Sequence, residues 1–389
     1  MSETIESVLR ESRMVTIVMT DGSEAQIPSS VNLVCAIAIL RAVDTLSELA
    51  DLDMRLSYQE WERVNEMIGL SRKGAKNPGI QIDVLRIMRD SKYAVFVQDM
   101  LPSMSREDVS RFVQHTVRGH VFSLSLDSFG CRVIQKLIEI GTTEDVLGLV
   151  HPELASKVVD CSLDVNGNHV IQKIIDVLPS GDCQFVVDAI LADRPTSLRR
   201  LCSHCFGCRV VQRVMSKCSP AQTDDLFEAL CSDPNLIVSL AGDAFGNYVV
   251  QHAIEYGRPI DMDRVVVCLA SLDIVMLGCC KFASNVVEKL IRSQNKPSLT
   301  TPSSVVVMKL LISSLMTCVS DDHEPAIMSL MKDRYGNYIV RAIVELTNPE
   351  FAAEVGLVTS MIVSNAASLK KFTFSWHLVE RLGKRNHGL

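Results

Sequence analysis

Asp127-Ser-Phe-Gly-Cys-Arg-Val-Ile-Gln135 is the first clear copy of a nine-residue motif that recurs along the chain. The later copies, which define repeats two to six, are Asp164-Val-Asn-Gly-Asn-His-Val-Ile-Gln172, His204-Cys-Phe-Gly-Cys-Arg-Val-Val-Gln212, Asp243-Ala-Phe-Gly-Asn-Tyr-Val-Val-Gln251, Cys280-Lys-Phe-Ala-Ser-Asn-Val-Val-Glu288 and Asp333-Arg-Tyr-Gly-Asn-Tyr-Ile-Val-Arg341. Successive fifth residues are separated by 37, 40, 39, 37 and 53 positions. Such a period is typical of a stacked repeat protein. The seventh and eighth positions stay apolar, as packing requires, whereas the fifth, sixth and ninth vary in polar character.

Each repeat is expected to contain a short helix, a longer helix that carries the motif, and a polar link. Apolar residues of the second repeat recur at the spacing of a buried helical stripe, namely Val170, Ile171, Ile174, Ile175 and Leu178. The aspartates that open four of the motifs are interpreted as helix caps rather than acid catalysts. The glycine three residues later is expected to let the chain turn into the helix. The predicted fold class is therefore all-α, a superhelical solenoid of helical repeats.

Net charge, cysteine content and apolar stretches limit the classes of protein to which the chain can belong. The chain has 389 residues, a net charge of −7 and 47% hydrophobic residues. An acidic balance lowers the expectation of a nucleic-acid partner, but a solenoid can carry an acidic outer face and a basic inner one. Thirteen cysteines without an apolar leader indicate free thiols in a reducing compartment. The longest apolar stretches, 31–40 and 265–280, are too short or too interrupted to span a membrane.

The fifth and ninth motif positions lie one helical turn apart, so their side chains share a face, and the sixth lies at its flank. The candidate base-edge contacts are the pairs Cys131 and Gln135, Asn168 and Gln172, Cys208 and Gln212, Asn247 and Gln251, Ser284 and Glu288, and Asn337 and Arg341. The candidate stacking residues at the sixth position are Arg132, His169, Arg209, Tyr248, Asn285 and Tyr338. Most of these are planar groups that stack on a base, which favours contact with single-stranded nucleic acid.

With six such motifs in order, residues 85–385 resemble the Pumilio, or PUF, family of RNA-binding proteins. The resemblance implies a right-handed, crescent-shaped superhelix that reads one base per repeat. In the family, Asn with Gln reads uracil, Cys or Ser with Gln reads adenine, and Ser with Glu reads guanine. A carboxylate such as Glu288 accepts from both N1–H and N2–H of guanine, whereas an amide donates and accepts. Carried over in the family's antiparallel orientation, the six repeats predict the RNA core UGUAUA.

The sequence departs from the family pattern at both ends. Arg341 stands where a glutamine is expected, so the first uracil is predicted to be read weakly, or Arg341 to touch a phosphate. A worn copy at residues 90–98 keeps only the final glutamine, Gln98, which we retain as a candidate base-edge contact. Ala94 and Val95 in that copy can neither bond to a base nor stack on one as the family's residues do. Since no first copy is visible upstream, six bases are expected to be read.

The predicted domains are a helical N-terminal segment at residues 1–84, interpreted as a degenerate capping repeat, and an RNA-binding domain at residues 85–389. A closing helix is expected at residues 374–382. Residues 293–304 are interpreted as an inserted loop within the 53-residue interval. This loop, or the convex face, is the expected place for partner proteins. Its deletion is expected to weaken a partner's binding and to spare RNA affinity.

Two other functions stay open. A HEAT- or armadillo-type scaffold that binds protein does not need matched pairs at the fifth and ninth positions. A nucleolar factor of rRNA processing usually loses those pairs, and the chain has none of the basic runs expected there. Cys202, Cys205 and Cys208 have the spacing of a zinc knuckle, but are interpreted as core or lining thiols. We expect no metal and no cofactor.

No phosphate-binding loop or catalytic motif is present in the sequence, so we predict that the chain is not an enzyme. Resemblance to the family further implies a cytoplasmic regulator that is monomeric on RNA and has no membrane partner. It would bind the 3′ untranslated regions of messenger RNAs and, through recruited proteins, repress translation or reduce mRNA stability.

Overall fold

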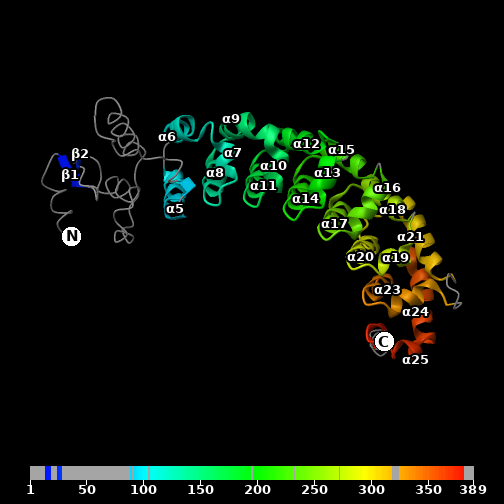
Figure 1. Ribbon diagram of the computed structural model, residues 1–389. Coiled ribbons are helices and arrows are strands. Elements are labelled where there is room, and N and C mark those ends of the chain that lie inside the picture. Colours follow the sequence, from blue (N-terminus) through cyan, green and yellow to red (C-terminus); the bar gives the residue numbers. More distant parts are fainter. Residues whose placement is uncertain are drawn as a thin grey trace. The chain divides into compact units, whose positions relative to one another are not determined.

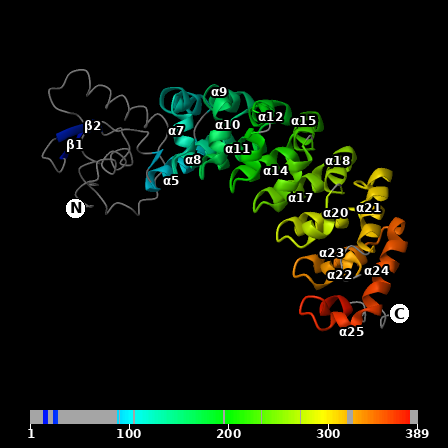
Figure 2. The same ribbon diagram turned by 45° about the vertical axis from the view of Figure 1, so that its right-hand side comes forward.

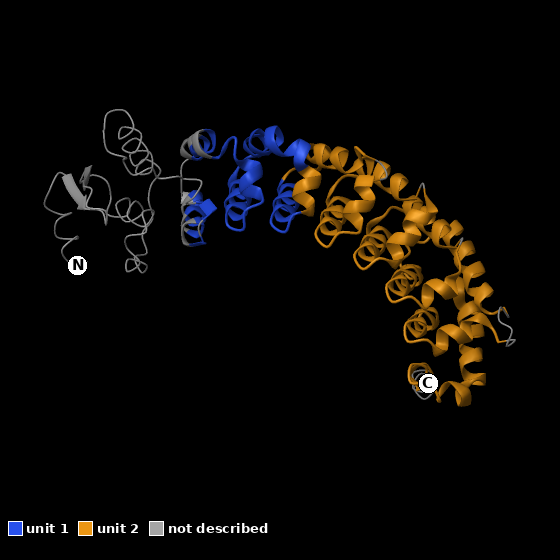
Figure 3. Cartoon of the chain, in the orientation of Figure 1, with its two compact units in different colours: residues 1–157, 164–177 blue, residues 158–163, 178–389 orange. Residues whose placement is uncertain are grey.

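The computed structural model describes residues 14–18, 24–28, 88–89, 91–103, 106–193, 196–231, 233–270, 272–317 and 324–380. The chain divides into two compact units (Figure 3). Unit 1 comprises residues 1–157 and 164–177, and unit 2 comprises residues 158–163 and 178–389. The predicted domain boundary between residues 84 and 85 lies outside the described residues.

Near the N-terminus, two short strands form an antiparallel pair. Strand β1 (Met14–Val18) pairs with β2 (Glu24–Pro28), with Met14 opposite Pro28 and Val18 opposite Glu24. β1 is apolar apart from Thr16, and in β2 the apolar Ala25 and Ile27 alternate with polar residues; both patterns are compatible with strands. The prediction of a helical segment at residues 1–84 is therefore wrong for these two stretches, and the rest of that segment lies outside the described residues.

In unit 1, the helix with the worn copy (α5) and the helices of the first two motifs (α8 and α11) pack in succession. This order follows because α8 contacts both α5 and α11. The helices of unit 1 are α5 (Ser91–Met100), η2 (Leu101–Ser103), α6 (Arg106–Phe112), η3 (Val113–Val117), α7 (Val121–Ser125), α8 (Gly130–Ile140), α9 (Thr143–Leu154), η4 (Ala155–Lys157) and α11 (Gly167–Val177). The turn η3 is π-helical, and it is followed by Gly119, whose positive φ of 85° suits glycine.

Unit 2 is built from two rows of helices. The motif helices α14, α17, α20 and α23 pack consecutively, and α15, α18, α21 and α24 form the second row (Figures 1 and 2). Bounds in the first half are α10 (Val158–Leu163), η5 (Ser180–Cys183), α12 (Gln184–Leu191), α13 (Thr196–Cys202), α14 (Gly207–Lys217), α15 (Pro220–Cys231), α16 (Pro234–Gly242), α17 (Gly246–Tyr256) and α18 (Pro259–Ala270). Those in the second half are α19 (Ile274–Gly278), α20 (Ala283–Ser293), α21 (Pro302–Leu315), α22 (Ala326–Lys332), α23 (Gly336–Val344), η6 (Pro349–Phe351), α24 (Ala352–Ser364) and α25 (Ala366–Leu369).

Each repeat has three helices, not the two that the sequence predicted. In the third repeat, the short α13 precedes the motif helix α14, and the expected polar link contains a third helix, α15. Pro220 occupies the first turn of α15, where its missing N–H costs nothing, so this proline begins a helix instead of marking a loop. The all-α prediction is confirmed for the repeats.

The core of each repeat is formed by the apolar pair of its motif together with the short helix before it. Val249 and Val250 of the fourth repeat are 0% and 1% exposed, and Leu240 of α16 is fully buried beside them. A Cβ on Gly246 would lie 2.8 Å from the carbonyl oxygen of Leu240. The motif glycine is therefore required by close packing against the short helix. The predicted reason, freedom to turn, is wrong for this position, which lies in a right-handed helix.

The extra length of the sixth repeat is shared by two connections. Residues 294–301 join α20 to α21, and residues 316–325 join α21 to α22. Within the first connection, Asn295 Oδ1 accepts from the N–H of Thr347 at 2.8 Å, and the carbonyl of Gln294 accepts from Asn348 Nδ2 at 3.0 Å. Of the residues 293–304 interpreted as an inserted loop, 294–301 lie between helices, whereas Ser293 ends α20 and 302–304 open α21. Residues 294 and 295 are hydrogen-bonded to the segment that follows α23.

Candidate nucleic-acid interface

The first residue of most motifs caps the start of the motif helix. Asp243 Oδ1 accepts from the N–H groups of Phe245 and Gly246 at 2.8 and 2.7 Å. Equivalent bonds are made by Asp127, Asp164 and Asp333. In the third repeat, His204 Nδ1 takes the same place at 3.3 and 3.4 Å. The capping interpretation of the aspartates is confirmed, and it accounts for their recurrence without acid chemistry.

The fifth and sixth positions differ in burial in the same way in all six repeats. Fifth-position side chains are nearly buried, with exposed fractions of 1% for Cys131, 2% for Asn168, 1% for Cys208, 1% for Asn247, 5% for Ser284 and 8% for Asn337. The sixth-position residues are all exposed, and Tyr248 and Tyr338 reach 50% and 47%. Ninth-position side chains are half-buried. Each repeat thus presents one exposed side chain, at the sixth position, beside a buried side chain at the fifth and a half-buried one at the ninth.

In the asparagine repeats, the amide at the fifth position is oriented by the protein. Asn168 Nδ2 donates to the carbonyls of Asp164 and Val165, both at 2.9 Å. Its Oδ1 accepts from Gln172 Nε2, also at 2.9 Å. The fourth repeat has the same bonds, with Gln251 Nε2 at 2.9 Å from Asn247 Oδ1. The glutamine is left with an acceptor oxygen and a second N–H for a ligand, a pattern that suits the imide edge of uracil.

In the cysteine repeats, the glutamine is held by the backbone instead. Gln135 Nε2 donates to the carbonyl of Cys131 at 3.1 Å, and Gln212 Nε2 donates to that of Cys208 at 3.0 Å. Burial raises the pKa of both thiols, although the neighbouring Arg132 and Arg209 oppose the shift. These thiols therefore stay neutral and offer a small surface against which a purine edge fits.

The last two repeats carry charged residues at the ninth position, and these belong to one ionic network. Glu288 Oε1 lies 2.8 Å from Arg292 Nε, and Arg292 Nη1 lies 2.8 Å from Glu345 Oε2. Glu345 Oε1 is in turn 3.4 Å from Arg341 Nε. Burial opposes charge on Arg292, but hydrogen bonds with Glu345 and Glu288 outweigh it and raise its pKa. The network joins the ninth positions of two adjacent repeats.

In the two repeats whose ninth residue is charged, the residue four places later has the opposite charge. In repeat order, the residues four places after the ninth position are Glu139, Asp176, Ser216, Glu255, Arg292 and Glu345. An arginine stands there only where the ninth residue is the acidic Glu288. Residues four apart on a helix are neighbours, so opposite charges at this spacing attract. Arg292 and Glu345 lie beyond the nine-residue motif and were not predicted from it, although their spacing of four from the ninth position indicates the contact.

The worn copy forms the same local geometry without a polar pair. Ala94 is 1% exposed and Val95 is 54% exposed on α5, as at the fifth and sixth positions elsewhere. Gln98 Nε2 donates to the carbonyl of Ala94 at 2.9 Å, like the glutamines of the cysteine repeats. Only the ninth position therefore offers a hydrogen-bonding side chain here, and a role for Gln98 in RNA binding stays a prediction.

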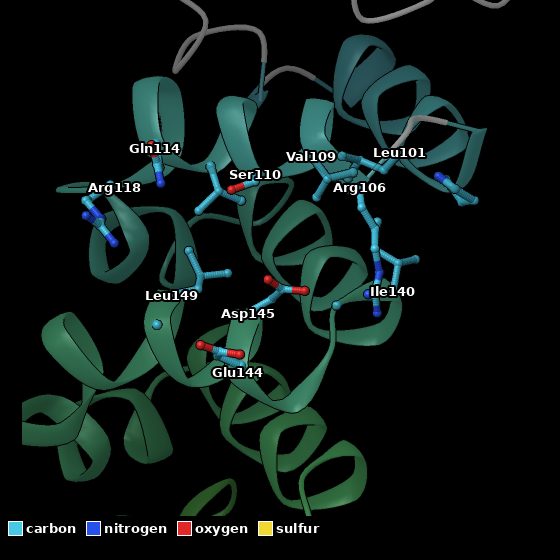
Figure 4. Close-up of a pocket in the computed structure, with 14 residues that line it drawn as sticks. Leu101, Arg106, Val109, Ser110, Gln114, Arg118, Ile140, Glu144, Asp145 and Leu149 are labelled. Atoms are coloured by element: carbon cyan, nitrogen blue, oxygen red, sulfur yellow. The ribbon is translucent and has the colours of Figure 1, made fainter.

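A cavity in unit 1 lies apart from the motif positions (Figure 4). It has a volume of about 320 Å³ and is lined by residues of η2, α6, η3, α8 and α9. Its carboxylate Asp145 is already engaged, because it accepts from Thr142 Oγ1 at 2.6 Å in the cap of α9. Hydrogen bonds with Thr142 lower the pKa of Asp145. No fifth, sixth or ninth motif residue borders this cavity.

Of the three cysteines with zinc-knuckle spacing, two are buried in helices, and Cys205 is half-buried in the turn between them. Cys202 is buried in α13, and Cys208 is buried on α14. Within the described ranges, no three His, Cys, Asp or Glu side chains are grouped so as to hold a metal ion. None of the helices in the described part of the chain has the length and apolar character needed to cross a lipid bilayer.

Comparison with protein families matches the repeats directly. The family described as "Pumilio-family RNA binding repeat" matches residues 120–151, 157–191, 198–231, 237–268, 273–296 and 327–352. Each matched segment contains one of the six motifs. The chain belongs to the Pumilio family. The predicted family and its helical-repeat fold are confirmed.

Relatives and solved structures agree with this assignment. A Pumilio domain-containing protein of Schizosaccharomyces pombe is 31% identical over 269 residues, covering 69% of this chain and 36% of that protein. Fem-3 mRNA-binding factor 1 of Caenorhabditis elegans is 27% identical, covering 75% of this chain and 48% of its own length. The chain thus spans about a third to a half of the length of these relatives. PUF-8 in complex with PBE-RNA superposes with a TM-score of 0.67 at 24% identity, covering 91% of this chain and 95% of that one. A Puf4 variant bound to a Cox17 RNA 3′ UTR recognition sequence gives 0.63 at 27% identity, covering 76% and 93%.

Proposed function

We propose that this Pumilio-family chain binds single-stranded RNA in a sequence-specific manner and reads the core UGUAUA. The observation that carries the proposal is the common pattern of six motif helices: a buried fifth residue, an exposed sixth and a half-buried ninth. Packing alone needs the apolar pair, but it does not need this ordered set of hydrogen-bonding groups. The repeats read antiparallel to the RNA, so the sixth repeat takes the 5′ base.

Base choice follows from the groups left free at each repeat. Gln172 and Gln251 in the asparagine repeats offer an acceptor and a donor, which suits uracil. Cys131 and Cys208 are small, so an adenine fits beside the paired glutamine. Glu288 offers only acceptors, which suits the N1–H and N2–H of guanine and disfavours the acceptor N1 of adenine. Reading of the first uracil by Asn337 and Arg341 is the weakest element of the predicted core.

Binding strength comes mainly from stacking. The exposed sixth residues are Arg132, His169, Arg209, Tyr248, Asn285 and Tyr338. Stacking of a base on an aromatic side chain contributes about 1–3 kcal/mol. A wrong base at one position costs about 1–3 kcal/mol. Stacking therefore sets the overall affinity, and the fifth and ninth residues set the discrimination between bases.

The proposed biological role is post-transcriptional. Fem-3 mRNA-binding factor 1 is named for mRNA binding, and related structures carry 3′ UTR recognition sequences. These names support binding of 3′ untranslated regions by this chain. We further propose that such binding represses translation or reduces mRNA stability in the cytoplasm. Silencing would act through recruited proteins, for which the second row of helices in unit 2 (α15, α18, α21 and α24) is the proposed surface. Residues 294–301 are less suited to a deletion test, because they are bound to Thr347 and Asn348.

The test is equilibrium binding of the purified chain to UGUAUA, to the same RNA with each base changed singly, and to a scrambled hexamer. All RNAs are compared at one stated salt concentration, because phosphate contacts make affinity salt-dependent. The proposal predicts tight binding of UGUAUA, and the largest single losses at the guanine and at the bases facing repeats two to four. Equal binding of all RNAs would instead support a shape-binding factor. No binding of any RNA would support a protein-binding scaffold.

A further inference from the structure

Two cysteines of unit 2 meet where the third helices of repeats three and four pack together. Cys231 is the last residue of α15, and Cys268 lies in the last turn of α18; these helices are neighbours in the second row (Figure 2). The Sγ of Cys268 donates to the carbonyl of Cys231 at 3.6 Å. A further hydrogen bond joins the two thiols themselves. The two side chains are therefore in contact, although 37 positions separate them in the sequence.

An ionic cluster near the start of the same two helices fixes one against the other. Asp224 of α15 pairs with Arg264 of α18, whose Nη1 lies 3.2 Å from Asp224 Oδ1. Arg258, just before α18, pairs with the same carboxylate and with the buried Asp261. The two thiols are thus brought together by helices that are already held in place, and a covalent bond between them needs little rearrangement of the backbone.

The two thiols of this pair differ in reactivity. The hydrogen bond from Cys231 lowers the pKa of Cys268, although burial opposes the shift. The same contact, together with burial, raises the pKa of Cys231. Because the thiolate is the reactive form of cysteine, Cys268 is the sulfur that attacks an oxidant. Cys231 lies beside it as the thiol that resolves the product, which is the arrangement common in redox-sensing cysteines.

The exposure of the pair limits the size of the oxidant. Cys268 is 7% exposed and Cys231 is half-buried, so a bulky reagent has little access to the attacking sulfur. Hydrogen peroxide is small enough for such a site. Cys202 shows the opposite case of a thiol that only packs, since burial raises its pKa.

We propose that Cys231 and Cys268 are an oxidation site, at which hydrogen peroxide joins repeats three and four by a reversible disulfide. The Cys268 thiolate attacks one peroxide oxygen, the O–O bond breaks, and the departing hydroxide takes up a proton to form water. The resulting sulfenic acid is attacked by the sulfur of Cys231, the S–O bond breaks, and hydroxide leaves with the proton of Cys231 as a second water. Two thiols are thereby oxidised by two electrons, and one peroxide is reduced to two waters.

The bridge would act on stability, and this inference does not depend on RNA binding. It joins α15 to α18 and leaves the motif helices α14 and α17 unmodified. A disulfide stabilises a fold mainly by restricting the unfolded chain. Disulfides in reducing compartments are usually transient and sense oxidants. Oxidation is therefore expected to hold the middle of unit 2 together until a thiol reductant opens the bond.

The test exposes the reduced, full-length chain to a small molar excess of hydrogen peroxide and then blocks the remaining thiols by alkylation. Peptide mass spectrometry should find a linked peptide that contains Cys231 and Cys268. Thermal unfolding of the oxidised protein should shift upward by about 5–15 °C. Dithiothreitol should remove both the linked peptide and the shift.

Single substitutions assign the bridge to this pair. Cys231→Ser and Cys268→Ser should each abolish the linked peptide and the shift in Tm. In Cys231→Ser, which keeps the attacking sulfur, dimedone should capture a sulfenic acid on Cys268. The matched control is Cys218→Ser, because Cys218 is also half-buried and hydrogen-bonds to another cysteine, Cys183. This variant should keep both the linked peptide and the shift.

The proposal is overturned if wild type yields no linked peptide at peroxide concentrations that oxidise the exposed Cys280. It is also overturned if Cys268→Ser retains the full shift in Tm, since the stabilisation would then come from other cysteines. Thermal unfolding of each reduced variant shows whether it is folded. If one serine variant does not fold, the other gives the same test, because each removes one sulfur of the bridge.

Discussion

Repeats three and four differ from repeats five and six in how the ninth residue is held. Gln212 and Gln251 are neutral and bond only within their own helices, to Cys208 and Asn247. Glu288 and Arg341 are charged, and both are tied to Glu345, directly or through Arg292. A neutral ninth residue is therefore oriented by a hydrogen bond within its own helix. A charged ninth residue is held by an ionic network that joins one repeat to the next. The network makes the two C-terminal repeats a coupled pair.

The start of the motif helix differs between the same regions. The fourth repeat has Asp243 as a cap and Gly246 packed against Leu240. The fifth repeat has Cys280 and Ala283 in these places. Substituting Gly246→Ala tests whether the fourth repeat tolerates the residue that the fifth one carries. We expect a loss of about 2–3 kcal/mol in the free energy of unfolding, because the added Cβ overlaps backbone atoms of Leu240.

Chemical denaturation with urea measures this loss. Gly242→Ala is the matched control, since a Cβ there meets nothing within 4 Å. Equal stability of the two variants would show that the close approach at Gly246 is not a constraint.

The substitution Arg292→Ala tests whether the ionic network couples the ninth-position residues Glu288 and Arg341. It leaves Glu288 without its orienting partner and removes one of the two arginines that neutralise Glu288 and Glu345. We expect binding of UGUAUA to weaken about tenfold, since hydrogen bonds to charged groups contribute about 1.5–3 kcal/mol and these side chains are partly exposed. Preference for guanine over adenine at the second base should fall as well. Competition binding with the two RNAs measures both changes.

The control for Arg292 is Lys289→Ala on the same helix. The ammonium of Lys289 pairs across repeats with Glu255, at 2.7 Å, and Glu255 is not a ninth-position residue. The guanine preference should be unchanged in this variant. If Arg292→Ala and Lys289→Ala alter the preference equally, the network has no special role in reading.

Cys280→Asp should stabilise the fifth repeat. The substitution supplies the cap that Asp243 and Asp333 provide to their helices, which contributes about 1 kcal/mol. Asp243→Ala should cost a similar amount in the fourth repeat. Thermal unfolding of the two variants beside wild type measures the opposite shifts in Tm. A fall in Tm with Cys280→Asp would show that the fifth motif does not start in the same way.

Arg341→Gln is expected to have the smallest effect. It gives the sixth repeat the Asn–Gln pair of the fourth and removes one arginine from the network at Glu345. Discrimination in favour of uracil at the first base should rise about threefold, about 0.6 kcal/mol beyond the stacking that Tyr338 already supplies. Competition between UGUAUA and AGUAUA measures it. A fall in uracil preference would mean that Arg341 itself reads the base.

Motif spacing was sufficient to predict the helical repeats and the capping aspartates. It did not predict that the fifth residue of a motif, such as Asn168, is buried while the sixth, such as Tyr248, is exposed. It was insufficient for the third helix of each repeat, because helices such as α15 begin at proline and end without a recurrent signal. The strands β1 and β2 were missed because short apolar stretches suit helix and strand equally. Arg292 and Glu345 lie outside the motif, so their contact depends on the packing of two helices.

The most direct test of the account is to give the fifth repeat the two base-reading residues of the fourth. The double substitution Ser284→Asn and Glu288→Gln gives the fifth repeat the pair found at Asn247 and Gln251. Wild type and the double variant are each titrated with UGUAUA and UUUAUA at the same salt concentration. The account predicts that wild type prefers UGUAUA and that the variant prefers UUUAUA. Retention of the guanine preference by the variant, or loss of discrimination in both proteins, would contradict it.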